Sequence, residues 1–316
     1  TQGVSSAASD VYKRQVRGMT TADAKTLALD LRRPKDEDAE RTSLSFRGEA
    51  RLQAAAGTQG FGGTASVLGV GEVLASGQAA TDGLPFASVH DEDLNRLEAP
   101  RLAINANIAT GYGARGGMAS IDGGGELIVR GGARLSAGDL ILGGSQLTIE
   151  EGATLGTIGR GRASFDSSDG YVFYGRGVLA LSNGWLNMLL RSPSNGEQPG
   201  SGSVDIGRCV TASCTGTTTL VSEGTLAIAT DGTLSLADNV SYGTRNLLLA
   251  VAAVNLGEDA SIAAAASAGR LPSGLGLNQG RLGSLLAGNS ATGAPALETL
   301  VLNARDAVNV LSLIHI

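Results

Sequence analysis

Aromatic side chains gather in one short stretch of a chain that is otherwise poor in them. Rings make up 3% of the sequence. The stretch contains Phe165, Tyr171, Phe173, Tyr174 and Trp185, accompanied by Arg160, Arg162 and Arg176. An exposed ring can stack on a sugar face and an arginine can donate hydrogen bonds to it, so Tyr174, Trp185 and Arg176 are candidates for contact with a glycan. The alternative, which we favour, is a widened turn of the fold whose interior these rings fill.

A second group of residues that could do chemistry is His90-Asp91-Glu92-Asp93. Its carboxylates could bind a divalent cation, but we interpret it as a solvated turn. Outside the C-terminal tail His90 is the single histidine, which leaves one possible base for a Ser-His-Asp triad. Residues 111–116 match G-x-G-x-x-G, yet a strand-like segment follows them instead of a helix. We therefore expect no catalytic residues, no cofactor and no metal.

The chain has two cysteines, Cys209 and Cys214. A lone pair is too small for a four-ligand zinc site. In an exported protein the pair is expected to close a small loop with a disulfide, and otherwise to remain as two inert thiols.

Composition limits the partners and the core. The net charge is -6, which disfavours nucleic acid and anionic lipid as partners. The apolar runs are shorter than the ~18 residues needed to cross a bilayer, so the chain is not expected to span a membrane. The 47 glycines and the low aromatic content predict a core of Leu, Val, Ile and Ala between many tight turns.

A repeat organises the chain. The sequence ELIVRGGARL, from Glu126, is followed 20 residues later by QLTIEEGATL, from Gln146. Side chains at i and i+2 of a strand share a face, and glycine supplies the corners between short strands. Three sides of about seven residues make a turn of roughly 20, which predicts an all-β fold, a parallel β-helix (β-solenoid) with projecting loops. Further copies of the apolar pattern are expected at 44–52, 226–234, 254–262 and 300–308.

The repeat assigns side chains to opposite faces of the strands. We expect the following residues to point inward: Leu127, Val129, Leu147, Ile149, Leu226 and Ile228. Ile128, Thr148 and Ala227 are expected to point outward.

The two ends differ from the rest. Residues 1–15 and 311–316 resemble adaptor-derived sequence and are expected to be non-native extensions. Residues 16–310 are predicted to form one β-helix domain. Composition predicts loop insertions in it near 32–41, 191–203 and 270–295.

Three sequence segments carry a family resemblance: LAIATDGTLSL from Leu226, ETLVLNARDAVN from Glu298, and LEAPRLAI from Leu97. They resemble the shaft of filamentous-haemagglutinin-like exoproteins. The resemblance implies a right-handed β-helix, export by two-partner secretion through an outer-membrane transporter, and a place outside the cell or on its surface. It also implies attachment to a glycan or protein on a host or neighbouring cell.

Two kinds of function follow. The first is a structural or adhesive shaft segment of a large secreted bacterial surface protein, which is not an enzyme. The alternative is a polysaccharide-active β-helix enzyme or an autotransporter passenger domain. An enzyme would need paired carboxylates or a metal beside a groove.

Overall fold

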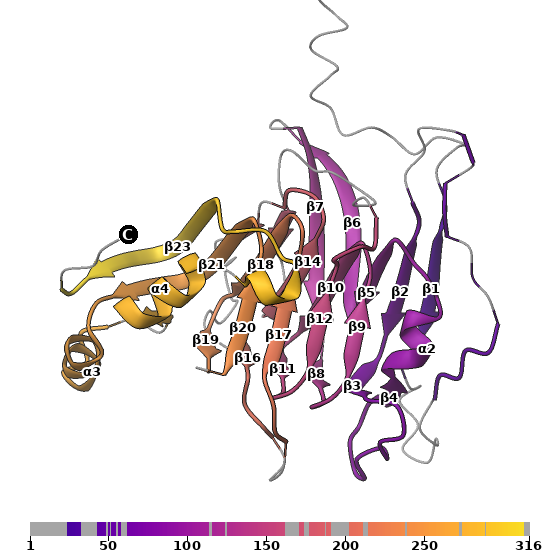
Figure 1. Cartoon of the computed structure of the whole chain (residues 1–316), viewed down its shortest axis with the longest axis horizontal. Coiled ribbons are helices and arrows are strands. Elements are labelled where there is room, and N and C mark those ends of the chain that lie inside the picture. The colour runs from indigo at the N-terminus through magenta and orange to yellow at the C-terminus, as the bar shows by residue number, and fades with distance from the viewer. Residues whose placement is uncertain are drawn as a thin grey trace, which may run out of the picture.

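The computed structural model describes residues 24–32, 43–48, 50, 52–54, 56–57, 62–113, 116–123, 125–161, 171–173, 177–186, 188–190, 202–210, 214–237, 239–271, 274–287 and 289–312. The fold is mostly β, and its three main sheets are built largely from parallel strands (Figure 1). Short helices lie at the margins of these sheets.

The described residues form four sheets. Sheet A comprises β1 (Thr26–Asp30), β2 (Thr64–Leu68), β5 (Arg101–Ile104), β10 (Asp139–Gly144), β14 (Gly177–Ser182), β18 (Thr225–Thr230), β21 (Asn246–Leu256), β22 (Leu275–Leu277) and β23 (Thr299–Val310). Sheet B comprises β4 (Ala87–His90), β3 (Val70–Leu74), β8 (Glu126–Val129), β11 (Gln146–Ile149), β16 (Ser203–Ile206) and β19 (Thr233–Leu236). Sheet C comprises β6 (Ala106–Gly113), β7 (Gly116–Gly123), β13 (Tyr171–Phe173) and β15 (Met188–Leu190). Sheet D comprises β9 (Arg134–Ser136), β12 (Thr154–Gly156), β17 (Thr218–Val221) and β20 (Val240–Gly243).

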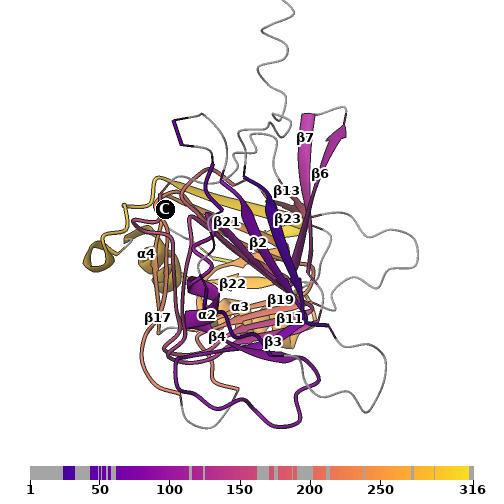
Figure 2. The same cartoon turned by 90° about the vertical axis from the view of Figure 1, so that its right-hand side faces the viewer.

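The chain visits three of these sheets in a recurring order. Strands β8, β9 and β10 belong to sheets B, D and A in turn, and β16 to β18 and β19 to β21 repeat that order. Figure 2 shows strands of the three sheets on different sides of the molecule, with β17 at the left, β3 along the bottom and β2 running obliquely. Leu127 is in register with Leu147, and Leu135 with Leu155, so the predicted spacing of 20 residues is confirmed in sheets B and D.

The main core is a set of apolar ladders that run across the strands. In sheet A one ladder of paired residues is Leu27, Ala65, Leu102, Leu140, Leu181, Leu226, Leu247 and Leu300. Side chains of sheets B and D join these in one buried cluster. All six side chains predicted to point inward belong to it. Aliphatic contacts of this kind exclude water along the whole stack.

A polar ladder lies one residue before the leucine ladder in most strands of sheet A. Its paired members are Thr26, Thr64, Arg101, Asp139, Ser182, Thr225, Asn246 and Thr299. Arg101 Nη2 lies 3.1 Å from Asp139 Oδ2, and Ser182 Oγ donates to Asp139 Oδ1 at 2.5 Å. A slip of one residue would put these polar groups into the core, so the ladder fixes the register.

Sheet C covers the outer face of sheet A. Ala227 points away from the main core, as predicted, but it is buried in a second apolar cluster with Ile141, Leu186 and Met188. Ile128 also faces outward and is nevertheless buried. The predicted outward direction is therefore confirmed at these two positions, and both side chains are buried because other segments pack over the strands.

Two elements depart from parallel pairing. Strand β14 runs antiparallel to both β10 and β18. Strands β6 and β7 form an antiparallel pair, and the G-x-G-x-x-G segment 111–116 falls across their connection. The pattern thus marks a hairpin.

Several sequence predictions are wrong. The copy of the repeat expected at 44–52 has no strand at 44–46, and Ile262 of the copy expected at 254–262 lies in helix α3 (Asp259–Ser267). Segment 270–295 is more than a loop insertion, since it contains β22, helix α4 (Gln279–Ala287) and the 3₁₀ helix η1 (Ser290–Thr292). The non-native origin of residues 311–316 stays a prediction; within that stretch the backbone N–H of Leu311 donates to Leu256 O, and Ser312 Oγ accepts from the N–H of Glu258. Residues 1–15, 33–41 and 191–201 lie outside the described residues.

Helix α2 (Asp91–Asn95) covers the free edge of sheet D. Asp91 Oδ2 accepts from the N–H of Arg134 at 2.7 Å, and Asn95 binds both Ser136 N and Arg134 O. These bonds satisfy backbone groups of β9 that would otherwise form an open edge. The segment at His90 is thus a helix start and not the predicted solvated turn. None of the helices in the described part of the chain is long and apolar enough to cross a membrane.

Leu147→Ala is expected to lower the free energy of unfolding by ~2–5 kcal/mol, because its neighbours Leu127 and Val204 are held in register and cannot close the cavity. Thr148→Ala, on the opposite face of β11, is the matched control and should cost about 1 kcal/mol or less. Urea denaturation measures both. Equal losses for the two variants would contradict the stacked core.

Candidate functional site

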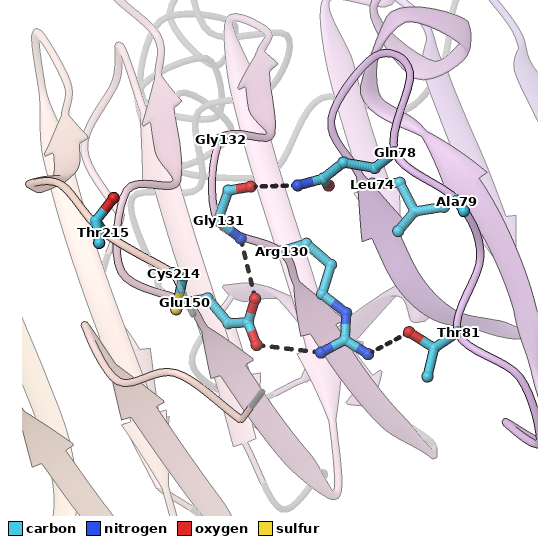
Figure 3. A pocket seen from close by; sticks show the side chains of 10 residues that line it. All are labelled: Leu74, Gln78, Ala79, Thr81, Arg130, Gly131, Gly132, Glu150, Cys214 and Thr215. Atoms are coloured by element: carbon cyan, nitrogen blue, oxygen red, sulfur yellow. Dashed lines mark hydrogen bonds and ion pairs between the residues drawn. The ribbon is translucent and has the colours of Figure 1, made fainter. Parts of the chain in front are cut away.

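A hollow of about 430 Å³ lies at the corner where sheet B gives way to sheet D (Figure 3). Its walls come from the end of β3 and the loop after it, from the turns after β8 and β11, and from the chain beside a disulfide. The lining residues are Leu74, Gln78, Ala79, Thr81, Arg130, Gly131, Gly132, Glu150, Cys214 and Thr215. We call this feature the ionic corner.

Two members of the ionic corner occupy the same position in successive repeats. Arg130 follows β8 and Glu150 follows β11, and a glycine with positive φ comes two residues later in each case, Gly132 at 85° and Gly152 at 86°. Both turns close with a backbone bond, from Ala133 N to Arg130 O and from Ala153 N to Glu150 O. The matching turns bring Arg130 Nη1 to 3.1 Å from Glu150 Oε1.

Glu72 of β3 completes a buried ionic triad. Its Oε2 lies 2.8 Å from Arg130 Nε, and its side chain is inaccessible to solvent. Thr81 donates to it through both its backbone N–H and its hydroxyl, and Ser88 donates through its hydroxyl. Arg130 Nη2 in turn donates to Thr81 Oγ1 at 2.9 Å. The guanidinium therefore joins strand β3, the turn after β11 and the loop that carries Thr81.

The Cys209–Cys214 disulfide expected for an exported protein is present, with the two Cα atoms 5.8 Å apart. Next to it, the backbone N–H of Val210 donates to Glu150 Oε1 at 3.0 Å. The N–H of Gly131 donates to Glu150 Oε2 at 3.0 Å. The disulfide thus holds a backbone donor against the carboxylate that Arg130 also binds.

The charges of the ionic corner compensate one another. Burial opposes ionisation of Glu72, but hydrogen bonds from Ser88, Thr81 and Arg130 outweigh it and hold the pKa of Glu72 below its ordinary value. A general acid needs a raised pKa near the working pH, which is the reverse of this shift. All three nitrogens of Arg130 donate to protein oxygens. This arrangement suits a structural clamp better than acid–base catalysis.

The predicted glycan contacts are placed only in part. Trp185 lies between β14 and β15 and is 39% exposed, so the interpretation of the rings as core filler is wrong for this residue. Thr225 Oγ1 accepts from the N–H of Leu186 and donates to Gly184 O, which fixes the backbone on both sides of Trp185. Tyr174 and Arg176 lie outside the described residues.

The acidic residues beside His90 are used structurally. Asp91 binds the N–H of Arg134, and Asp93 Oδ1 accepts from the N–H of Phe46. Within the described ranges, His, Cys, Asp and Glu side chains form no group of three that could hold a metal ion.

Sequence reasoning missed the ionic corner, although part of its signal was visible. Arg130 and Glu150 carry opposite charges at equivalent positions of the repeat, and in-register stacking makes them neighbours. Glu72 has no such signal, because it lies 58 residues from Arg130.

Comparisons of the chain with protein family models, with curated proteins and with solved structures find no match.

Acid should weaken the ionic corner. Because the pKa of Glu72 is lower in the folded chain than its ordinary value of about 4.5, its contribution to stability is complete above that value. It is lost as the pH falls through the folded pKa. Glu72→Gln should therefore be less stable than the wild type at pH 7, and the difference in the free energy of unfolding should shrink below about pH 4.5. A difference that is constant with pH would contradict this assignment.

Removal of the Arg130 guanidinium should leave the two buried carboxylates of Glu72 and Glu150 without their shared partner. Arg130→Ala is expected to cost ~3–5 kcal/mol of stability. Arg208→Ala is the matched control: Arg208 pairs with Asp205 at 3.7 Å, but its side chain is 65% exposed. Its loss should cost under ~1 kcal/mol. Comparable values for the two variants in denaturant unfolding would refute the role given to Arg130.

Proposed function

We propose that this chain is a segment of the shaft of a secreted bacterial surface protein, folded as a right-handed parallel β-helix. The shaft holds binding regions away from the cell and takes part in attachment or cell contact. The single observation that carries the proposal is the recurring order of sheets B, D and A together with in-register apolar ladders. A structure of this kind lengthens by adding turns, since each turn contacts only its neighbours.

One general rule and two further features of the molecule support the proposal. Right-handed crossovers are the rule between parallel strands. The Cys209–Cys214 disulfide fits an oxidising environment outside the cytosol. The strands of the main sheets stack along the long axis of the molecule, as a rigid spacer requires (Figure 1).

The geometry gives the enzymatic alternative less support. Glycoside cleavage needs two carboxyl groups facing a substrate across a fixed gap. The two carboxylates brought together at the ionic corner, Glu72 and Glu150, share Arg130 instead. An autotransporter passenger domain would use the same architecture. The route of export would distinguish it from a protein exported by two-partner secretion.

The purified chain is expected not to cleave a panel of neutral and uronate polysaccharides, and substrate turnover would overturn the shaft proposal. A glycan array tests adhesion. Binding should be weak, because one ring offers a small contact area, and many copies on a surface would compensate. Trp185→Ala should abolish that binding. Val308→Ala, which changes another exposed apolar side chain, should preserve it. Equal binding by both variants would remove Trp185 from the contact surface.

A further inference from the structure

The disulfide closes a short loop beside the ionic corner. Cys209 and Cys214 are five residues apart in the sequence. Both are only partly buried, and Cys214 lines the hollow, so a small thiol in solution can reach the bond. A crosslink over so short a loop removes less chain entropy than one over a long loop. The contacts that the disulfide holds in place therefore decide much of what it does.

The chain that carries Cys214 lies directly on two turns of sheet B. A Cβ atom on Gly131 would be 2.9 Å from the Cβ of Cys214, and one on Gly152 would be 2.7 Å from Thr215 O. These approaches leave no room for a side chain at either glycine. The disulfide thus ties Cys209 to a segment whose position is set by the turns after β8 and β11.

Val210, next to Cys209, contacts the ionic corner through its backbone. Its N–H donates to Glu150 Oε1 at 3.0 Å, and the same oxygen accepts from Arg130 Nη1 at 3.1 Å. The Val210 side chain is exposed, whereas the Glu150 carboxylate is buried. Withdrawal of the Val210 N–H would therefore leave a buried carboxylate short of a donor.

Arg130 links this carboxylate to the loop after β3. Figure 3 shows the guanidinium between Glu150 on one side and Thr81 on the other. Arg130 Nη2 donates to Thr81 Oγ1 at 2.9 Å, and the N–H of Thr81 donates to Glu72 Oε1 at 2.7 Å. If Glu150 turns toward water, the guanidinium loses one of its two carboxylates and the loop loses part of what holds it.

The reduced loop also has a place in this structure. Cys209 Sγ lies 3.7 Å from Glu151 Oε2, which can accept a hydrogen bond from the free thiol. The strands on both sides stay attached without the disulfide, because the N–H of Gly207 donates to the backbone of β11 and Thr218 Oγ1 donates to Glu150 O. Reduction should therefore act on the loop and leave β16 and β17 in position.

We propose that the Cys209–Cys214 pair is a redox switch that sets the strength of the ionic corner. The disulfide holds the Val210 N–H on Glu150 and, through Arg130, holds the loop that carries Thr81. Reduction releases both.

The redox step is an exchange with a small thiol. A dithiol gives up two electrons and two protons, the Sγ–Sγ bond breaks, each cysteine becomes a thiol, and the dithiol closes to its own disulfide. Oxidised glutathione drives the reverse step and leaves as two thiols. That oxidation accompanies export rests on the secretion proposed above, whereas the coupling to the ionic corner does not.

Hydrogen exchange resolved to single amides tests the switch on the full chain. The chain is compared after equilibration with oxidised glutathione and with dithiothreitol. Reduction should speed exchange at Gly131 and Thr81 about tenfold, because each of these amides donates to a carboxylate of the triad. Leu226, which is paired on both sides within sheet A, should exchange at the same rate in both states.

Two variants of Val210 separate the backbone donor from the disulfide. Val210→Pro removes the N–H and keeps both cysteines, so Thr81 should exchange as fast in the oxidised variant as in the reduced wild type. Reduction should then change that rate no further. Val210→Ala is the matched control: it keeps the N–H and alters an exposed side chain, so it should respond as the wild type does.

The coupling must also act in the reverse direction. An ionic corner that favours the oxidised loop makes the disulfide harder to reduce. In a glutathione redox buffer, Val210→Pro should therefore be reduced at a several-fold lower ratio of reduced to oxidised glutathione than Val210→Ala.

Three results would overturn the proposal. These are exchange at Thr81 that is the same in both redox states, exchange that accelerates equally at Leu226, and a response of Val210→Pro to reduction that equals the response of Val210→Ala. Should Val210→Pro not fold, the oxidised and reduced wild type still decide the first two. A glycan-binding result of either sign leaves this inference unchanged, so the two proposals can fail separately.

Discussion

In most strands of sheet A a polar first residue pairs with a polar residue of the neighbouring strand, and the leucine or alanine that follows it pairs with a leucine or alanine. Everything else in the molecule depends on this register. Because side chains alternate between faces, a slip by one residue would turn Arg101 and Asp139 into the core and Leu102 and Leu140 out of it. The cost of burying unpaired charges makes that slip far less stable than the observed pairing.

The same alternation explains how β14 is accepted although it runs in the opposite direction. A pattern with period two looks the same when it is read backwards, so the reversed strand still places Leu179 and Leu181 in the main core. Its last residue, Ser182, meets Asp139 where a parallel strand would have offered its first. To keep the apolar and polar ladders continuous, a strand must therefore have the right alternation of apolar and polar residues, whereas its direction can be reversed.

The sequence predicts those parts of the fold in which one turn follows the next without interruption. Leu127 and Leu147 belong to such turns, and their spacing is the physical length of one circuit. Where loops intervene, the spacing lengthens: Leu102 and Leu140 are paired although they lie 38 residues apart. Apolar spacing also fails to separate strand from helix over short runs, which is why Ile262 was assigned to a strand. The covering of Ala227 by sheet C depends on chain segments that no local pattern reveals.

The ionic corner shows how an insertion changes the requirements of a neighbouring turn. The chain that leaves β3 and returns as β4 passes over the outer face of sheet B, and Thr81 lies on that path. Glu72, which would otherwise face water, is thereby buried and needs donors of its own. Ser88, Thr81 and Arg130 supply them, and Arg130 is available because the turn below it presents Glu150 at the same corner. Buried ion pairs add little stability over apolar packing, but a missing partner is costly. The triad therefore fixes the position of the loop: where Thr81 lies, Glu72 is buried and fully hydrogen-bonded, and a path of the loop that still covered Glu72 but moved Thr81 away would leave the carboxylate with fewer donors.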